Sequence, residues 1–304
     1  MSLASGEFPR LFTVVIASVC DDARSGLLMR ACDSVRAMAD GLDYSIIVVA
    51  NGPRVSASVL EWLATRPDVE VIRLRSGSHP LARRVGAEMS NCEFLGFLDD
   101  DDELMPGMLE RKIAHFRDHP EVDVLVTDGW RVSSSGTTKI FPQLRARSPD
   151  LVQTMMQTGW GACAITLRSQ SVALSAFDAE FRHMEWTLTT LILARRYRFG
   201  FLDEPTYRYY ETTPNSLSKS SEHRLAEPEV WRRLAKEFTG TSYEAYALRR
   251  YAKACHAVSH GFALQGKMGE ALRFHAESLL SKGGLMYLPF SCRLLLYALG
   301  RPFK

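Results

Sequence analysis

The hydrophobic positions between residues 10 and 130 alternate between two spacings. Continuous runs rich in Val, Ile, Leu and Phe are typical of strands buried on both faces, whereas apolar residues three or four positions apart are typical of a helix face. The runs predict strands at residues 12–18, 44–50, 69–74, 93–98 and 122–127. The helical spacing predicts helices at residues 27–38, 58–65, 81–90 and 109–116. Strands and helices that alternate in this way predict an α/β domain with a mostly parallel sheet flanked by helices.

The pattern changes after residue 128 and again near residue 221. The intervening stretch predicts only short elements, with strands at residues 162–167, 197–202 and 206–210 and a helix at 184–196. The last part predicts helices at residues 224–237, 242–265 and 268–281, followed by an apolar stretch at 285–299. We therefore expect a first domain over residues 1–220 and a helical C-terminal region over residues 221–304.

Polar side chains follow three of the predicted strands. Ser18 ends the first, Asn51 the second, and four consecutive aspartates, Asp99 to Asp102, follow the run at 93–98. Ligands of open parallel sheets bind outside the carboxyl ends of the strands. We expect these groups to share one crevice.

The four aspartates are the strongest chemical signal in the chain. Two carboxylates about 4 Å apart repel by about 4 kcal/mol at an effective dielectric near 20. A bound cation would offset this repulsion, and the pattern therefore favours a metal site. The alternative is a solvated acidic loop that caps the helix beginning near Pro106.

Composition excludes several other classes of function. The formal charge of +2, without a basic stripe interleaved with aromatic residues, argues against a nucleic-acid partner. No segment has the roughly 20 apolar residues of a spanning helix. Six widely spaced cysteines suit a reducing cytoplasm better than a disulfide framework or a zinc site.

Four stretches in this order resemble the family 2 glycosyltransferases of GT-A fold. The likeness covers roughly residues 10 to 215, and the four stretches read FTVVIASVC with LMRACDSVRAM, SIIVVANGP, LARRVGAEMSNCEFLGFLDDDDELMPGMLE, and WGACAITLRSQSVALSAFDAEFRHMEWTL. The third is the most specific, because it carries an arginine element, an Asp-x-Asp (DXD) pair and a following proline. The resemblance implies a nucleotide-sugar donor (a UDP-sugar is favoured), a divalent cation (Mn²⁺ or Mg²⁺), and transfer to an acceptor hydroxyl with inversion. We expect the acceptor to be a glycan or a lipid-linked molecule, as in surface polysaccharide or glycan assembly.

The resemblance assigns roles to particular residues. It implies that Asp101 binds the metal and that Asp99 assists it or holds the ribose, while Asp100 and Asp102 shape the loop. Arg83 falls at the arginine that contacts the nucleotide base or phosphate, and the alternative is a surface salt bridge. The donor nucleotide would therefore be bound by a set of five residues: Ser18, Asn51, Arg83, Asp99 and Asp100.

The resemblance further implies that Glu185, written here as Met184-Glu185-Trp186, is the catalytic base. An inverting displacement needs one carboxylate that accepts the proton of the acceptor hydroxyl. The alternative is a glutamate that interacts only with the positive end of a helix. Trp160 has two readings of equal weight, an aromatic floor for the sugar and a core residue.

Three departures from the family pattern keep other functions open. Ala50 stands where an acid usually holds the nucleobase, Met184 replaces the first acid of the acceptor-side pair, and no histidine occurs near residues 209–212. A non-catalytic sugar-nucleotide-binding or scaffold protein of this fold is therefore the main alternative. A nucleotidyltransferase is disfavoured, since no glycine-rich phosphate loop follows the first strand.

The apolar end of the chain at residues 285–299 is interrupted by Pro289 and Arg293 and is too short to span a bilayer. It predicts packing against the first domain or, as a homodimer, against a second copy. A peripheral contact with anionic lipid at the inner face of the membrane is the other interpretation.

Overall fold

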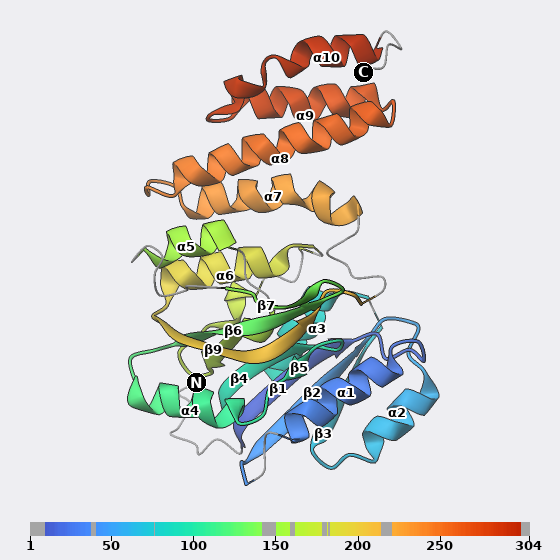
Figure 1. Ribbon diagram of the computed structural model, residues 1–304, viewed down its shortest axis with the longest axis vertical. Helices are drawn as coiled ribbons and strands as arrows, with labels where there is room; N and C mark the ends of the chain where they lie inside the picture. The colour runs from blue at the N-terminus through green and yellow to red at the C-terminus, as the bar shows by residue number, and fades with distance from the viewer. Residues whose placement is uncertain are drawn as a thin grey trace, which may run out of the picture. The chain divides into compact units, whose positions relative to one another are not determined.

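The structure is a computed structural model, and it describes residues 10–37, 41–75, 77–141, 150–158, 162–177, 181, 183–213 and 221–298. The chain divides into two compact units, residues 1–214 and 215–304. The first unit holds the sheet and the second is helical (Figure 1).

A sheet of nine strands runs through the described part of the first unit, in the order β3-β2-β1-β4-β8-β6-β9-β5, with β7 paired to β6. The strands are β1 (Arg10–Ser18), β2 (Tyr44–Asn51), β3 (Val69–Leu74), β4 (Cys92–Asp99), β5 (Glu103–Leu104), β6 (Val124–Ser133), β7 (Gly136–Lys139), β8 (Ile165–Arg168) and β9 (Phe199–Tyr210). The helices that flank the sheet are α1 (Ser25–Arg36), α2 (Ala57–Ala64), α3 (His79–Met89), α4 (Met108–Asp118), α5 (Leu151–Thr158) and α6 (Glu185–Arg196). Short 3₁₀ turns are η2 (Ala162–Ala164) and η3 (Leu174–Ala176).

The predicted α/β architecture is confirmed. Strands β3, β2, β1 and β4 pair in parallel, and the central strands β1, β2 and β4 are buried along almost their whole length. The rest of the sheet is mixed, since β8 is antiparallel to both β4 and β6, while β6 and β9 are parallel. The parallel pairing that we expected for most of the sheet is found among β3, β2, β1 and β4 and again between β6 and β9.

Several local predictions were wrong. The two strands expected at residues 197–202 and 206–210 form the single strand β9, in which Pro205 sits opposite Asp128 at an irregularity of register. A proline, which lacks an N–H, is tolerated at such a bulge. The first half of the strand expected at residues 162–167 forms the turn η2. The helix α5 and the strand β5, which has only two residues, were not predicted.

The second unit consists of α7 (Ser221–Glu237), α8 (Glu244–Leu264), α9 (Met268–Leu280), the 3₁₀ turn η5 (Gly284–Tyr287) and α10 (Phe290–Ala298). Side chains of α8 and α9 bond across the hairpin: Ser259 Oγ donates to the Ala271 carbonyl at 2.7 Å, and Ser278 Oγ to the Ala252 carbonyl at 2.8 Å. Pro289 lies between η5 and α10, and the described part of the apolar stretch, residues 285–298, is a turn and a short helix. Among the described residues, none of the helices combines the length and the apolar character needed to cross a bilayer.

Candidate functional site

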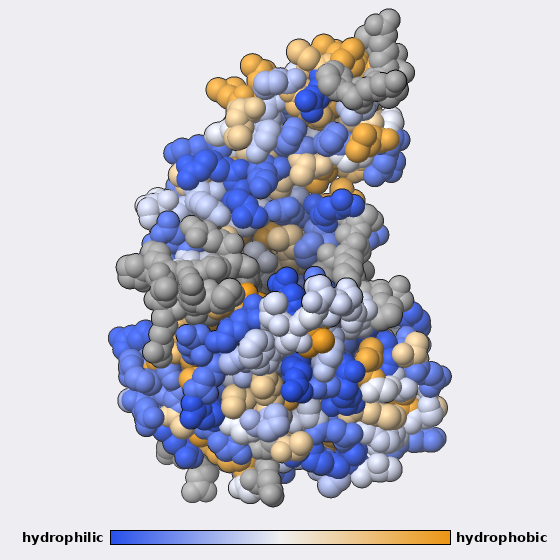
Figure 2. Space-filling view, in the orientation of Figure 1, coloured by the Kyte–Doolittle hydropathy of each residue, from blue (hydrophilic) through white to orange (hydrophobic). Residues whose placement is uncertain are grey.

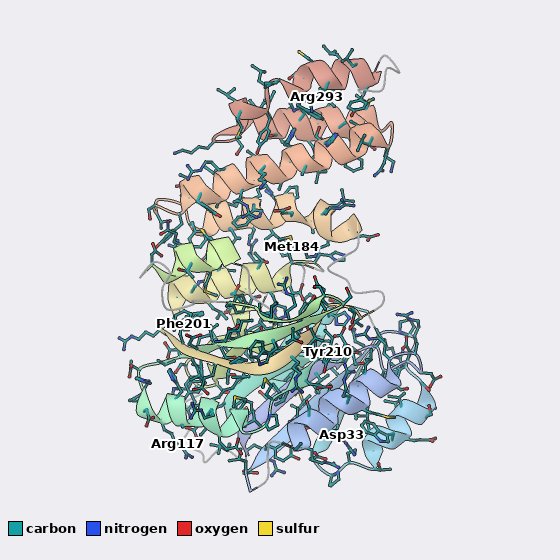
Figure 3. All side chains as sticks on the ribbon, in the orientation of Figure 1. Asp33, Arg117, Met184, Phe201, Tyr210 and Arg293 are labelled. Atoms are coloured by element: carbon teal, nitrogen blue, oxygen red, sulfur yellow. The ribbon has the colours of Figure 1, made fainter. Side chains whose placement is uncertain are left out.

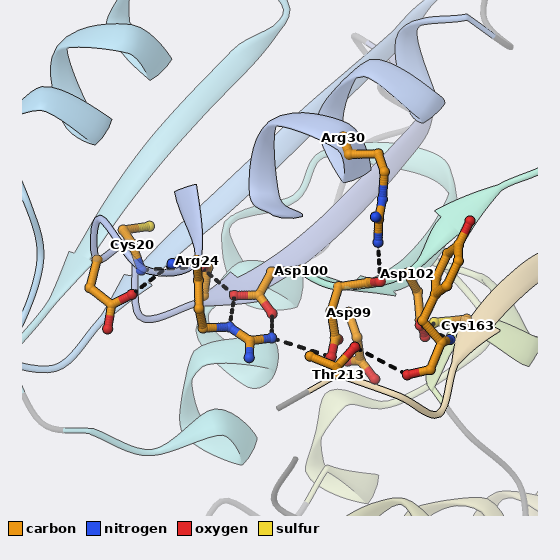
Figure 4. A network of polar contacts seen from close by, with 12 residues as sticks. Cys20, Arg24, Arg30, Asp99, Asp100, Asp102, Cys163 and Thr213 are labelled. Atoms are coloured by element: carbon orange, nitrogen blue, oxygen red, sulfur yellow. Dashed lines mark hydrogen bonds and ion pairs between the residues drawn. The ribbon is translucent and has the colours of Figure 1, made fainter. Parts of the chain in front are cut away.

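The four aspartates form the turn between β4 and β5 rather than a loop that leads directly into a helix. Asp99 is the last residue of β4, and its carbonyl accepts a hydrogen bond from the Asp102 N–H at 3.1 Å. Strand β5 then pairs with Tyr207 and Arg208 of β9. The turn is thus held between two strands, and Figure 4 shows Arg24 beside Asp100 and Cys163 beside Asp102.

Asp100 is buried and is bound by groups of the β1–α1 segment. Its carboxylate accepts a hydrogen bond from Ser18 Oγ at 2.6 Å and from Arg24 Nε at 3.2 Å, and a second guanidinium nitrogen of Arg24 pairs with its other oxygen. Ser18 and Asp100 therefore hold each other at the carboxyl edge of the sheet. Sequence reasoning missed Arg24; the available signal was a cation shortly after Ser18, which the sequence places at the same edge of the sheet as the aspartates.

Asp101 lies half-buried, and a guanidinium nitrogen of Arg24 is 3.4 Å from its carboxylate. Burial raises the pKa of Asp101, and the neighbouring carboxylates of Asp99 and Asp100 raise it further. Arg30 donates a hydrogen bond to the Asp101 carbonyl at 2.9 Å and so supports the backbone of the turn. The pKa of Asp101 is raised overall because the Arg24 guanidinium group does not offset the effects of burial and of the neighbouring carboxylates.

Asp102 is buried on the opposite side of the turn. Its carboxylate accepts hydrogen bonds from the Tyr210 N–H at 3.1 Å and from the Cys163 thiol at 3.3 Å (Figures 3 and 4). Burial, followed by the charges of Asp99 and Asp101, raises the pKa of Asp102 well above its ordinary value. Ligand atoms of Asp99, Asp102 and Cys163 all lie within 4.8 Å of one another, which is a spacing that could hold a metal ion.

Arg83 of α3 joins the acidic turn to the candidate base. One guanidinium nitrogen donates to Asp99 Oδ1 at 2.6 Å, and the other is paired with the carboxylate of Glu185. Burial by itself lowers the pKa of Arg83, but the charges of Asp99 and Glu185 outweigh it and the net shift is upward. The two carboxylates thus share one buried cation.

Glu185 is the first residue of α6, and the residue before it has an unusual backbone. Met184 (labelled in Figure 3) has a φ of 59°, in the left-handed region that non-glycine residues seldom occupy. Among the described residues, Cys20 in the β1–α1 segment is the other non-glycine with positive φ, at 49°. Strain of this kind persists where the surrounding structure enforces it, and it is often found at functional sites.

A shallow pocket lies beside Glu185. Its lining residues come from α3, the end of η3 and α6, and are Pro80, Arg83, Phe177, Glu185, Trp186 and Thr189. Trp186 packs edge-on against Phe97 and Phe177, with ring centroids 5.2 and 6.1 Å apart. The pocket therefore combines an apolar wall with one carboxylate and one guanidinium group.

Asn51 lies at the carboxyl edge, as expected, and its side chain supports the neighbouring helix. Its Oδ1 accepts a hydrogen bond from the Ser78 N–H at 2.9 Å, and Ser78 Oγ caps α3 by accepting from the Leu81 N–H at 3.4 Å. Asn51 thereby connects β2 to the start of the helix that carries Arg83. Ala50 is fully buried between Ser18 and Arg73 of the adjacent strands.

His79, the first residue of α3, was not identified from the sequence. Burial and the charge of Arg83 lower the pKa of His79, while Asp100, Asp99 and Glu185 act in the opposite direction. The signal was its place four residues before Arg83. Trp160 lies outside the described residues.

Known proteins resemble this chain in sequence and in fold. The family model described as Glycosyl transferase family 2 matches residues 15–174. Among curated proteins, the chain is similar to the uncharacterized glycosyltransferase EpsJ of Bacillus subtilis (strain 168), with 27% identity over 191 residues, which is 58% of this chain and 55% of that protein. The chain therefore spans about half the length of this relative.

Solved structures resemble the chain over nearly all of its length. A crystal structure of S. aureus TarS 1-349 matches with a TM-score of 0.62 and 17% identity, covering 97% of this chain and 93% of that one. The complex of TarS 1-349 with UDP-GlcNAc matches with a TM-score of 0.64 and 16% identity over the same shares. At this level of identity the likeness shows a shared fold.

Proposed function

The chain belongs to glycosyl transferase family 2, and from that premise we propose that its first unit transfers a sugar from a nucleoside-diphosphate donor to an acceptor hydroxyl with inversion at the sugar carbon. Membership of the family makes the protein a glycosyltransferase. The finer statements, namely inversion, metal dependence and the roles of single residues, are the proposal.

The observation that carries the proposal is the pair of contacts made by Arg83. Asp99 belongs to the Asp-x-Asp pair expected on the donor side, and Glu185 is the acid expected on the acceptor side. One guanidinium group contacts both carboxylates. This shared contact supports a single site for the donor-side and acceptor-side acids, as a direct displacement requires.

In the proposed reaction the Glu185 carboxylate accepts the proton of the acceptor hydroxyl. The acceptor oxygen forms a bond to the anomeric carbon while the bond from that carbon to the diphosphate oxygen breaks, and the electron pair leaves with the diphosphate. Attack on the face opposite the leaving group inverts the configuration. Glu185 lines the shallow pocket, where a base can meet an incoming hydroxyl.

The acidic turn fits a divalent cation. The raised pKa values of Asp101 and Asp102 reflect, after burial, repulsion among carboxylates that a cation would relieve. Carboxylate oxygens suit Mn²⁺ or Mg²⁺, whereas burial raises the pKa of the Cys163 thiol well above its ordinary value and so keeps this sulfur protonated. We assign the metal to Asp99 and Asp101, with Asp102 as a further oxygen donor. A bound cation would neutralise charge on the leaving diphosphate.

The donor nucleotide is assigned to the carboxyl edge of β1, β2 and β4. Asp99 would contact the ribose and Arg83 the base or the phosphates, while Ser18, Asn51 and Asp100 line the site and hold its loops. Complexes of TarS 1-349 with UDP and with UDP-GlcNAc support a UDP-sugar as donor. A glycan or lipid-linked acceptor remains the proposal for the second substrate.

The test compares the wild-type chain with Glu185→Gln. We expect hydrolysis or transfer of UDP-GlcNAc to fall by about 10²–10⁴ in kcat, because a positioned general base contributes about that factor. Binding of UDP with Mn²⁺, read as a thermal shift, should be retained in Glu185→Gln and lost in Asp101→Asn. Asp118→Asn, at the exposed end of α4, is the control for both readouts.

The same experiment distinguishes the alternative, a sugar-nucleotide-binding protein without transferase activity. Ala50 and the absence of a histidine near Tyr210 favour this alternative. Wild-type protein that binds UDP with Mn²⁺, but turns over none of a panel of nucleotide sugars faster than Glu185→Gln does, would establish it. Unchanged UDP affinity in Asp101→Asn would contradict the metal site.

A further inference from the structure

The end of the second unit displays apolar side chains to solvent. Five of them, which we call the apolar tip, are 54% to 89% exposed: Leu280, Leu285, Met286, Leu288 and Leu295. Single exposed leucines are common on protein surfaces, whereas a cluster within one short segment marks an interaction surface. Figure 2 shows hydrophobic surface around η5 and α10, where this segment lies.

The turn that carries the apolar tip is held in place by packing. The Tyr287 ring stacks on His256 of α8 with centroids 4.2 Å apart, and Phe290 is buried against His256, His260 and His275. A Cβ at Gly284 would lie 1.7 Å from the Ser278 carbonyl oxygen, so only glycine fits there. With Tyr287 and Phe290 directed inward, Leu285, Met286 and Leu288 are directed outward on a fixed turn.

In the sequence, the charged residues that follow Glu277 are all cations. Lys282 and Arg293 are exposed on either side of η5. Residues 278–304 contain these two cations together with Arg301 and Lys304, and no Asp or Glu, although the whole chain has a formal charge of only +2. Apolar side chains flanked by cations complement the acyl boundary and the negative headgroups of an anionic bilayer.

We propose that the apolar tip, with Lys282 and Arg293, docks the chain onto the surface of an anionic lipid bilayer. Leu285, Met286 and Leu288 enter the headgroup boundary, and the two cations contact lipid phosphates. A second copy of the chain fits less well, since a two-fold interface built on this surface would bring like charges together. The inference stands apart from the transfer chemistry, because it uses no residue of the candidate site.

The test is co-sedimentation of the full chain with vesicles of phosphatidylcholine, with or without about 30 mol% phosphatidylglycerol. We expect binding to the anionic vesicles, and a decrease when salt is raised from about 0.1 M to about 1 M, which shortens the Debye length from about 10 Å to about 3 Å. The double variant Leu285→Gln/Met286→Gln should lower the partition coefficient at least about tenfold. The double variant Lys282→Gln/Arg293→Gln should lower the partition coefficient by roughly fivefold or more on anionic vesicles and should leave it unchanged on neutral ones.

The control is Leu225→Gln, which changes an exposed leucine on α7, a helix that carries no residue of the apolar tip, and should leave binding within about twofold. Thermal unfolding checks that each variant is folded. The proposal is overturned if the wild type stays in the supernatant, if it binds neutral and anionic vesicles equally, or if the double variant binds as the wild type does. A concentration-dependent dimer that the double variant abolishes, without vesicle binding, would assign the surface to a second copy instead.

Discussion

Arg83 pairs with two carboxylates that reach it from different elements. Its planar guanidinium group presents several N–H donors in fixed directions, which a lysine ammonium cannot reproduce. Asp99 closes β4 and Glu185 opens α6, so the position of each carboxylate depends on the same side chain. At the scale of the residue, Arg83 therefore sets the distance between the two acids to which we assign the chemistry.

We predict that Arg83→Lys lowers kcat/KM by about 10²-fold, because a displacement of about 1 Å in a catalytic group costs about that much. It should also lower the free energy of unfolding by about 1.5–3 kcal/mol, the range for a hydrogen bond to a charged group. Urea unfolding and donor hydrolysis measure the two effects. The control is Arg84→Lys, next in the chain, whose ion pair with Glu88 is exposed and contributes at most about 0.5 kcal/mol. Equal behaviour of the two variants would contradict the role of Arg83.

At the scale of the element, the close approach of α3 to the sheet determines the position of Arg83. A Cβ at Gly86 would lie 2.4 Å from Val15 Cγ1 of β1 and 3.2 Å from Val49 Cγ2 of β2. Arg83 is almost one turn earlier on this helix. The absence of a side chain at Gly86 therefore sets how near the guanidinium group comes to the carboxyl edge of the sheet.

Gly86→Ala should destabilise the chain by about 1–3 kcal/mol, since the added methyl group must displace Val15 or the helix. It should also weaken UDP binding, as Arg83 moves with α3. Gly261→Ala is the matched control: nothing lies within 4 Å of a Cβ there, and alanine in a helix interior should stabilise by about 0.5–1 kcal/mol. Urea unfolding measures whether each variant is less or more stable than the wild type. An unchanged free energy of unfolding in Gly86→Ala would show that α3 has room to move.

At the scale of the whole molecule, the two units differ in how their chain segments meet. The first unit joins strands that are distant in sequence, whereas the second is built from consecutive helices. The helical unit gathers titratable groups around Phe290: His256 and His260 come from α8, His275 from α9, and Arg293 lies on α10. Its stability should consequently depend on pH.

Burial lowers the pKa of both His256 and His275, and for His256 the charges of His260, His275 and Arg293 act in the same direction. A lowered pKa in the folded state means that folding favours the neutral imidazole. The stabilisation is complete above the ordinary histidine pKa of about 6.5 and is lost as the pH falls through the lowered value. The unfolding midpoint of the helical signal should therefore decrease as the pH is lowered from about 7.5 to about 5.

The variant His275→Gln should reduce this dependence on pH, because Gln can still bond Ser291, whose hydroxyl is 2.7 Å from His275 Nε2, without taking up a proton. His119→Gln, at an exposed histidine of the first unit, should leave the dependence unchanged. Circular dichroism during heating measures the midpoints. A midpoint that rises toward low pH would contradict the prediction.

Features that depend on short stretches of sequence were predicted well. The strands β2 and β3 lie where the apolar runs at residues 44–50 and 69–74 placed them, to within one residue. The family resemblance seen in the four stretches is confirmed by the match over residues 15–174. The sequence also placed Ser18, Asn51 and the aspartates at the carboxyl edge, because a parallel sheet brings its strand ends together.

The partners of those side chains were not predicted. Asp100 bonds Arg24, Asp102 bonds Cys163, and Asn51, which was expected to line the nucleotide site, bonds the backbone of Ser78. Nothing in the local pattern indicates which carboxylate of a tetrad faces solvent and which is buried. Which carboxylate is buried depends on the turn into β5. This strand has two residues and is formed by its pairing with β9, so no local pattern predicts it.

By itself, the sequence determined most of the alternation of strands and helices up to residue 127, the family and the edge of the sheet at which polar groups gather. These follow from periodicity and from residue types that act over a few positions. Only the tertiary structure decided that Arg83 joins Asp99 to Glu185, that Met184 takes a left-handed backbone, and that five apolar side chains stay exposed at the end of the helical unit. The physical reason is that burial and ion pairing depend on packing between segments far apart in the chain, which no local spacing encodes.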